Sequence, residues 1–293
     1  MTNFKLSYIF TTRNKFESVK VSLEYLIRSL DEDDEIIVID GQSTDGTAEY
    51  LQSLYDNGDI NQLVIEPDYC QAHGTNKGML LARGEIIKII TDDDYYNYAE
   101  IKKCKQYMIN NPEVDVLNAN IAAQFTPGIP FRVIKEREKA YRLWSSGEGK
   151  PFWFSDHGLF IRRNKLPLVG LWDTNVICID VEYTLRMTAS HKINLVWYTG
   201  IVCVALVNQY SNFNRFADRV KNDTDRICHY YIDDYHPPVT PKPAKDFRTE
   251  EFFLTESIED SFSFSEQWLL SHNNDLKLEF LYSKQAVSGR LLS

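Results

Sequence analysis

Short apolar runs alternate with stretches of helical periodicity through the first 120 residues, and this alternation restricts the fold more than any other feature of the sequence. Between the runs, apolar residues recur at spacings of three and four, as in Phe16, Val19 and Leu23. Strands that alternate with helices form a largely parallel sheet with helices on both faces. We therefore expect an α/β fold. The predicted strands are Leu6–Phe10, Glu35–Asp40, Leu63–Ile65, Glu85–Thr91 and Val114–Leu117.

Three consecutive aspartates, Asp92, Asp93 and Asp94, directly follow the fourth of these strands. Two carboxylates about 4 Å apart repel each other by about 4 kcal/mol at an effective dielectric constant of about 20. Water, protonation or a hard cation such as Mg²⁺ or Mn²⁺ can offset that repulsion. An exposed acidic turn is the simpler alternative, but the buried strand before the motif favours a metal site. Asp40 and Glu66 also follow strands, so we expect them to converge with the aspartates on one crevice.

Composition and charge limit the classes of partner. A net charge of -10 argues against general affinity for nucleic acid or for an anionic membrane surface. The longest apolar stretch, Ile193–Val207, is interrupted and too short to span a bilayer, and the N-terminus has no signal-peptide pattern. We expect a cytoplasmic protein, with peripheral contact at the inner membrane face as an open alternative. Its five scattered cysteines, without a C-x-x-C pair, fit a reducing compartment: Cys70, Cys104, Cys178, Cys203 and Cys228.

The alternation of strands and helices changes along the chain and indicates how it is divided. Residues 125–150 are rich in Gly, Pro and charge, and we interpret them as an irregular loop. Beyond Tyr210 the strand–helix alternation is lost, and residues 237–243 form a stiff Pro-rich linker. The expected organisation is a domain over 1–210, with halves over 1–124 and 125–210, and a mainly helical C-terminal extension over 211–293.

Three segments together resemble the inverting nucleotide-sugar glycosyltransferases of family 2, which have the GT-A (Rossmann-like) fold. The first segment is similar to the family's V-D-[DG]-G-S-T-D-G-T motif, the second to its E-P-D…N-K-G…D-D core, and the third to the H-G-x-x-F-x-R…D-x-E-x-x-L-R pattern of one branch. The resemblance extends over roughly residues 5 to 210, and its segments are Ile37–Thr47, Glu66–Asp94 and His157–Arg186.

The resemblance implies a role for individual residues. Asp180 would be the catalytic base, with service as a helix N-cap as the alternative. Asp94 and Asp92 would hold a divalent metal, Mn²⁺ or Mg²⁺, and the division of roles among the three aspartates stays open. The nucleotide would be bound by Thr12, Arg13, Asp40, Asp68, Lys77, Asp92 and Asp93. The acceptor would be bound by His157 and Glu182, to which we add Trp144 because of its place in the sequence and not because of the resemblance.

Several of these roles have plainer alternatives. Thr12 can serve as an ordinary strand-end cap, and Lys77 as an exposed lysine. His157 can be a packing residue, and Glu182 a structural partner of Arg186. Trp144 draws attention because it falls in the segment that we interpret as an irregular loop, where an aromatic ring is available to stack on a sugar.

The leading hypothesis is a metal-dependent inverting glycosyltransferase that moves a sugar from a nucleotide diphosphate sugar, with UDP favoured, to a glycan or lipid-linked acceptor. Such an activity belongs to surface polysaccharide biosynthesis. One alternative is a sugar-1-phosphate nucleotidyltransferase, although the loop after the first strand lacks the glycines that those enzymes use to bind phosphate. The other is a sugar-nucleotide-binding protein without turnover. The sequence leaves the oligomeric state open.

Overall fold

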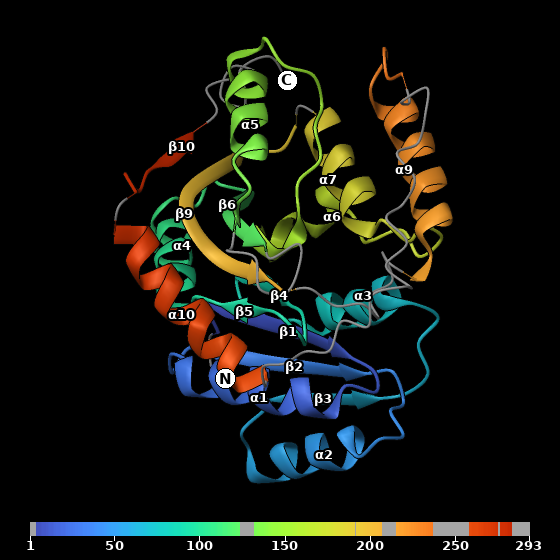
Figure 1. The fold of residues 1–293 in the computed structure, drawn as a ribbon, viewed down its shortest axis with the longest axis vertical. Helices are drawn as coiled ribbons and strands as arrows, with labels where there is room; N and C mark the ends of the chain where they lie inside the picture. Colours follow the sequence, from blue (N-terminus) through green and yellow to red (C-terminus); the bar gives the residue numbers. More distant parts are fainter. Residues whose placement is uncertain are drawn as a thin grey trace.

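The computed structural model describes residues 4–123, 132–190, 192–206, 215–236, 258–274 and 276–282. Within these residues a single mixed sheet of ten strands runs through the molecule, and helices cover both of its faces (Figure 1). The strand order is β10-β9-β6-β8-β4-β1-β2-β3, with β5 joined to β9 and β7 to β6. The expected α/β class is confirmed.

The first half of the chain forms the parallel part of the sheet. In β1, Ile9 pairs with Ile37 of β2 on one side and with Ile89 of β4 on the other. Alternate residues of these strands pack into two apolar cores, with α1 and α4 on one face and α3 and α7 on the other. The parallel strands are β1 (Leu6–Thr12), β2 (Asp34–Asp40), β3 (Gln62–Ile65) and β4 (Ile86–Ile90), and the helices are α1 (Phe16–Ser29), α2 (Thr47–Asn57), α3 (Gln71–Leu81) and α4 (Tyr98–Asn110).

The second half adds strands of both directions. β8 (Leu159–Arg162) lies between β4 and β6 (Val116–Ala123) and is antiparallel to both, whereas β9 (Leu195–Ala205) is parallel to β6. Three short strands complete the sheet: β5 (Tyr95–Tyr96), β7 (Arg132–Val133) and β10 (Phe280–Tyr282). The remaining elements of this half are the helices α6 (Leu166–Val169) and α7 (Ile179–Ala189) and the 3₁₀ turns η1 (Asp156–Gly158) and η2 (Arg163–Lys165).

The prediction of an irregular loop over 125–150 is wrong for residues 132–150, where the chain forms β7 and the helix α5 (Glu136–Ser146). Residues 124–131 lie outside the described part. Only Tyr141 and Trp144 of α5 are buried, among many charged residues, so the apolar stripe was too narrow to stand out. The apolar segment 152–154 lies outside the sheet, because the backbone N–H groups of Phe152 and Phe154 bond to Thr188 and Thr184 of α7.

The C-terminal extension packs against the domain. Helix α9 (Ala217–Tyr231) contacts α7, and α10 (Ile258–Asn274) contacts α1 and β9. Phe262 of α10 packs edge-on against Tyr25 and Tyr95. β10 then pairs antiparallel with β9, so this part of the extension adds an edge strand to the sheet (Figure 1). The predicted linker over 237–243 lies outside the described residues.

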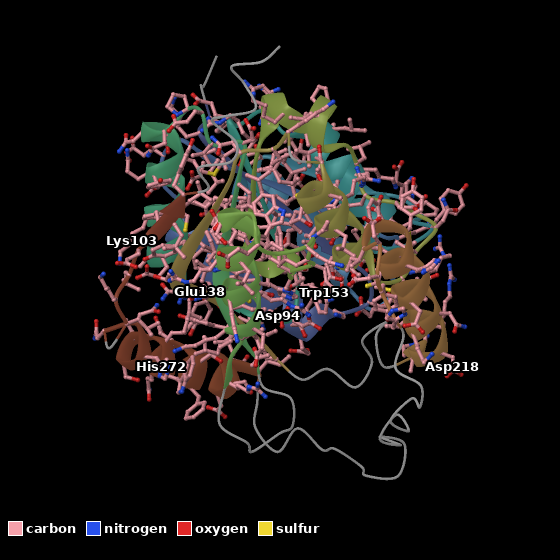
Figure 2. The ribbon with its side chains drawn as sticks, turned by 90° about the horizontal axis from the view of Figure 1, so that it is seen from above. Asp94, Lys103, Glu138, Trp153, Asp218 and His272 are labelled. Atoms are coloured by element: carbon pink, nitrogen blue, oxygen red, sulfur yellow. The ribbon has the colours of Figure 1, made fainter. Side chains whose placement is uncertain are left out.

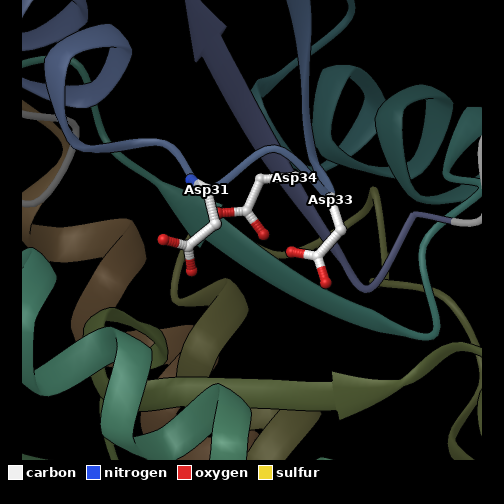
Figure 3. Close-up of side chains that lie close together, drawn as sticks. All are labelled: Asp31, Asp33 and Asp34. Atoms are coloured by element: carbon white, nitrogen blue, oxygen red, sulfur yellow. Dashed lines mark hydrogen bonds between the residues drawn. The ribbon is translucent and has the colours of Figure 1, made fainter.

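The acidic turn between α1 and β2 forms an ion-pair cluster with a lysine, and Figure 3 shows its three aspartates, Asp31, Asp33 and Asp34. Asp34 is buried, and the buried Lys105 of α4 places its Nζ 3.0, 2.5 and 2.6 Å from oxygens of Asp31, Asp33 and Asp34. These carboxylates form the one set of three candidate metal ligands that lies within 4.8 Å among the described residues. The single Lys105 ammonium contacts all three carboxylates and so occupies the point on which they converge, and we assign the cluster to an ion-pair network and not to a metal.

Removing the Lys105 ammonium should weaken the fold, because Asp34 would remain buried without its counter-charge. We expect Lys105→Met to lower the free energy of unfolding by about 3 kcal/mol or more, measured by urea denaturation. Lys102→Met is the matched control: Lys102 pairs with Asp31 at the surface, so its loss should cost less than about 1 kcal/mol. Equal losses for the two variants would contradict the assignment.

Candidate active site

The carboxyl ends of β1, β2 and β4 open on the same side of the sheet, and the turn η1 faces them from the second half of the chain. Thr12 ends β1, Asp40 ends β2, and the three aspartates follow β4. Viewed from above, Asp94 lies near the centre of the molecule (Figure 2). Asp40, Asp92 and Asp94 are buried. The expected convergence of acidic residues at this edge is therefore present, except that the exposed Glu66 turns to Lys77.

Asp92 and Asp93 are balanced by a lysine that the sequence analysis missed. Lys15 Nζ lies 2.9 Å from Asp92 Oδ1 and 2.8 Å from Asp93 Oδ2, and Thr12 Oγ1 donates to Asp92 Oδ2 at 2.7 Å. Burial, together with Asp93, raises the pKa of Asp92 to about 6, although Lys15 and Thr12 oppose the shift. Burial alone would lower the pKa of Lys15, but the two aspartates raise it above its ordinary value. Lys15 is therefore a fixed cation in the site.

Asp94 is balanced by His157. His157 Nε2 lies 2.8 Å from Asp94 Oδ2, Thr91 Oγ1 donates to the same oxygen at 2.6 Å, and the Leu206 N–H donates to Oδ1 at 2.8 Å. On its other side, His157 Nδ1 lies 3.2 Å from Asp156 Oδ1. Burial opposes the charged imidazole, yet Asp94 and Asp156 together raise its pKa well above the ordinary value. His157 is thus an imidazolium held between two carboxylates, a role beyond that of a packing residue.

Lys88 is a second lysine that the sequence did not single out, because it lies within the apolar strand β4. It is fully buried, and its Nζ donates to the carbonyl oxygens of Ile89 at 2.9 Å and of His157 at 2.7 Å. The rings of Tyr96 and Phe160 lie at 5.0 and 5.2 Å from the ammonium. Lys88 therefore ties β4 to the turn that carries His157. Burial lowers its pKa from 10.5 to about 8.

The predicted nucleotide-binding residues line the ends of β1 to β3. Asp40 accepts hydrogen bonds from the backbone and side chain of Ser43 and so closes the loop after β2. At Gly41 a Cβ would lie 3.1 Å from Arg13 Cδ and 3.3 Å from Asp68 Oδ2, so these two side chains meet over a bare backbone. Lys77 Nζ lies 2.8 Å from Asp68 Oδ1. Arg13, Gly41, Asp68 and Lys77 thus lie close together at this edge.

Asp180 lies in the first turn of α7 and opens on a cavity of about 420 Å³. The N-cap position of this helix belongs to Cys178, and no side chain caps it, so the plain N-cap alternative for Asp180 has no support. Burial and, next, the neighbouring Asp156 raise the pKa of Asp180 to about 7, while His157 opposes the shift. A carboxylate with such a pKa can accept a proton near neutral pH.

Two predicted acceptor residues do not reach this cavity. Trp144 is buried in α5, and its Nε1 donates to the Thr188 carbonyl at 2.9 Å, so its ring packs in the core. This placement corrects the interpretation of Trp144, which depended on an irregular loop. Glu182 pairs with Arg186 at 2.9 Å and accepts from Tyr231, as in the structural alternative.

The family model of glycosyl transferase family 2 matches residues 7–166, more than half of the chain. The chain therefore belongs to glycosyl transferase family 2, as the sequence motifs indicated. A comparison with functionally curated sequences finds no match. Among the helices that the structure describes, none is both long and apolar enough to span a bilayer.

Two solved structures show the same fold. One is a mannosyltransferase from Pyrobaculum calidifontis in complex with GDP-Man and Mn²⁺, with a TM-score of 0.60, 18% identity, and 92% of this chain and 71% of that chain covered. The other is TarS (residues 1–349) from S. aureus in complex with UDP-GlcNAc, with a TM-score of 0.56 and 15% identity. In the second case 78% of this chain aligns with 65% of that chain.

The pKa of Lys88 predicts how stability depends on pH. Between about pH 8 and pH 10.5 the unfolded chain binds more protons at this position than the folded chain, so the free energy of unfolding rises with pH there. Lys88→Met should lack this contribution. The unfolding free energy of the wild type minus that of the variant should therefore increase by about 2 kcal/mol from about pH 7.5 to about pH 10. Urea denaturation across this range measures it. The exposed Lys103→Met is the control, and a flat difference for Lys88→Met would contradict the prediction.

Proposed function

We propose that this family member is a metal-dependent inverting glycosyltransferase that transfers a sugar from a nucleotide diphosphate sugar, with UDP favoured, to a glycan or lipid-linked acceptor in surface polysaccharide biosynthesis. The observation that carries the proposal is the His157 turn. Its imidazole binds Asp94 at the carboxyl edge of β4, and its neighbour Asp156 lies beside Asp180, so one turn joins two groups of carboxylates. The fold neighbours that hold GDP-Man and UDP-GlcNAc support a nucleotide-sugar donor.

Asp92 and Asp94 are suited to bind a divalent ion together with the diphosphate of the donor. Asp92 and Asp94 offer carboxylate oxygens, the ligands that Mg²⁺ and Mn²⁺ prefer. Among the described residues they do not form a set of three converging protein ligands. Mg²⁺ is usually held by one or two carboxylates and by substrate phosphates, so this donor set fits. When bound, the ion would neutralise the charge that develops on the leaving diphosphate.

The residues of this chain divide the remaining work. Lys15, already placed as a fixed cation beside Asp92, lowers the negative potential that a diphosphate would meet there. Thr12 and Asp40 orient the edge on which the nucleoside would lie, with Asp68 and Arg13 beside it. Asp180 accepts the proton of the acceptor hydroxyl. At the same time the hydroxyl oxygen bonds to the anomeric carbon, and the bond from that carbon to the leaving phosphate breaks on the opposite face. Glu182 supports α7 through Arg186.

Donor binding is tested by thermal unfolding of the full chain with UDP, GDP or dTDP, each with and without Mn²⁺. We expect one nucleotide to raise the melting temperature in a Mn²⁺-dependent way, because only the folded state binds it. Asp94→Asn should abolish the Mn²⁺-dependent part, whereas the exposed Asp56→Asn, on α2, should retain it. Stabilisation by none of the nucleotides would refute the proposal.

Transfer is tested with Asp180→Asn, which removes the proton acceptor and keeps the shape of the side chain. We expect transfer to fall by at least about a hundredfold, with nucleotide-dependent stabilisation retained. For the wild type, kcat/KM should fall about tenfold per pH unit below about pH 7, because Asp180 must be ionised to act. Asp173→Asn, in the loop before α7, is the control. Loss of nucleotide binding together with transfer in Asp180→Asn would contradict its role as base.

A further inference from the structure

The cavity beside Asp180 contains an arginine without a partner. It lies between β6, the β7–α5 segment, residues 153–155 and the start of α7. Arg137 of α5 lines it, half-buried, and makes no hydrogen bond or ion pair with any residue that the structure describes. Its guanidinium carbon lies 3.4 Å from the ring centroid of Trp153. The guanidinium plane is therefore supported on the indole, while its N–H groups remain available.

The neighbouring arginines are different, and the contrast indicates that Arg137 is reserved for a ligand. Arg132 pairs with Glu136 and Arg142 with Glu138, each four residues away in the sequence. A partly desolvated guanidinium is costly when no acceptor takes its N–H groups, and a carboxylate or phosphate that accepts two parallel N–H bonds offsets that cost. Asp180 and Glu136 attract Arg137 at longer range, but among the described residues neither forms an ion pair with it, although Asp180 lines the same cavity.

The rest of the cavity wall includes both polar and apolar residues. Asn118, Asn120 and Ser155 are among the polar ones. Phe154 and Trp197 supply apolar wall. A volume of about 420 Å³ is of the size that small-molecule sites have.

We propose that this cavity is the acceptor site and that it selects a saccharide bearing a phosphate or carboxylate group, which Arg137 binds while Asp180 accepts the proton of the attacking hydroxyl. The proposal rests on the proposed function, because it needs Asp180 as base. An anionic acceptor approaching a carboxylate in a chain of net charge -10 requires a local cation, and Arg137 supplies it. The aromatic and apolar walls would cover the sugar ring.

The test uses isothermal titration calorimetry of the full chain with three probes: glucose 6-phosphate, glucuronate and glucose. We expect at least one anionic probe to bind about tenfold or more tightly than glucose, and the stronger of the two identifies the anion. Arg137→Gln should remove this preference, and Arg137→Lys should retain part of it, because charge remains without the planar fork. Arg142→Gln, five residues along the same helix, is the matched control and should bind as the wild type does.

Three results would overturn the proposal: equal affinity for all three probes, binding of none, or a preference that survives Arg137→Gln. Thermal unfolding with nucleotide and Mn²⁺, run on the same samples, separates this proposal from the proposed function. If a nucleotide stabilises both wild type and Arg137→Gln but no anionic preference exists, only the acceptor proposal fails. If no nucleotide stabilises the wild type, the proposed function itself fails.

Discussion

The charge balance around the three aspartates is the interaction on which the rest of the site depends. Asp92, Asp93 and Asp94 crowd at the end of β4, and their mutual repulsion would prevent burial if nothing opposed it. Lys15, from the segment after β1, offsets two of them, and His157, from η1, offsets the third. Lys15 belongs to the same half of the chain as the aspartates, but His157 comes from the second half, so the His157–Asp94 contact also fixes the two halves of the sheet against each other at this edge.

The same network sets the protonation behaviour of the proposed base. His157 lies between Asp94 and Asp156, and Asp156 in turn raises the pKa of Asp180. A change of charge near Asp94, such as the arrival of a cation and a diphosphate, would therefore be felt at Asp180 through a short chain of contacts. Lys88 donates a hydrogen bond to the carbonyl oxygen of His157 and so helps to fix the position of this turn. Burial of a lysine lowers the stability of the fold, and here the buried Lys88 positions the turn that carries His157.

Much of the fold and part of the site could be predicted from the sequence. The buried strands β1, β2 and β4 are largely apolar runs, and their carboxyl ends place Asp40 and the aspartates at one edge. The role of α5 could not be predicted, because few of its residues are apolar and its neighbours in sequence are irregular. Trp144 was misplaced for the same reason. The roles of Lys15, Lys88 and Arg137 could not be predicted from the sequence. Such a role depends on which residues lie near the charged group, and only the tertiary structure shows that.

By itself the sequence determined the α/β class, the family and the positions of the acidic motifs, because these depend on local periodicity and on short ordered patterns. Only the tertiary structure decided which charge neutralises which aspartate, that Asp31, Asp33 and Asp34 surround a lysine, and that Arg137 and Asp180 line the same cavity. It also decided that β8 runs antiparallel between β4 and β6 and so brings His157 to the site. These facts depend on pairings between residues some 40 to 80 positions apart, which no local pattern encodes.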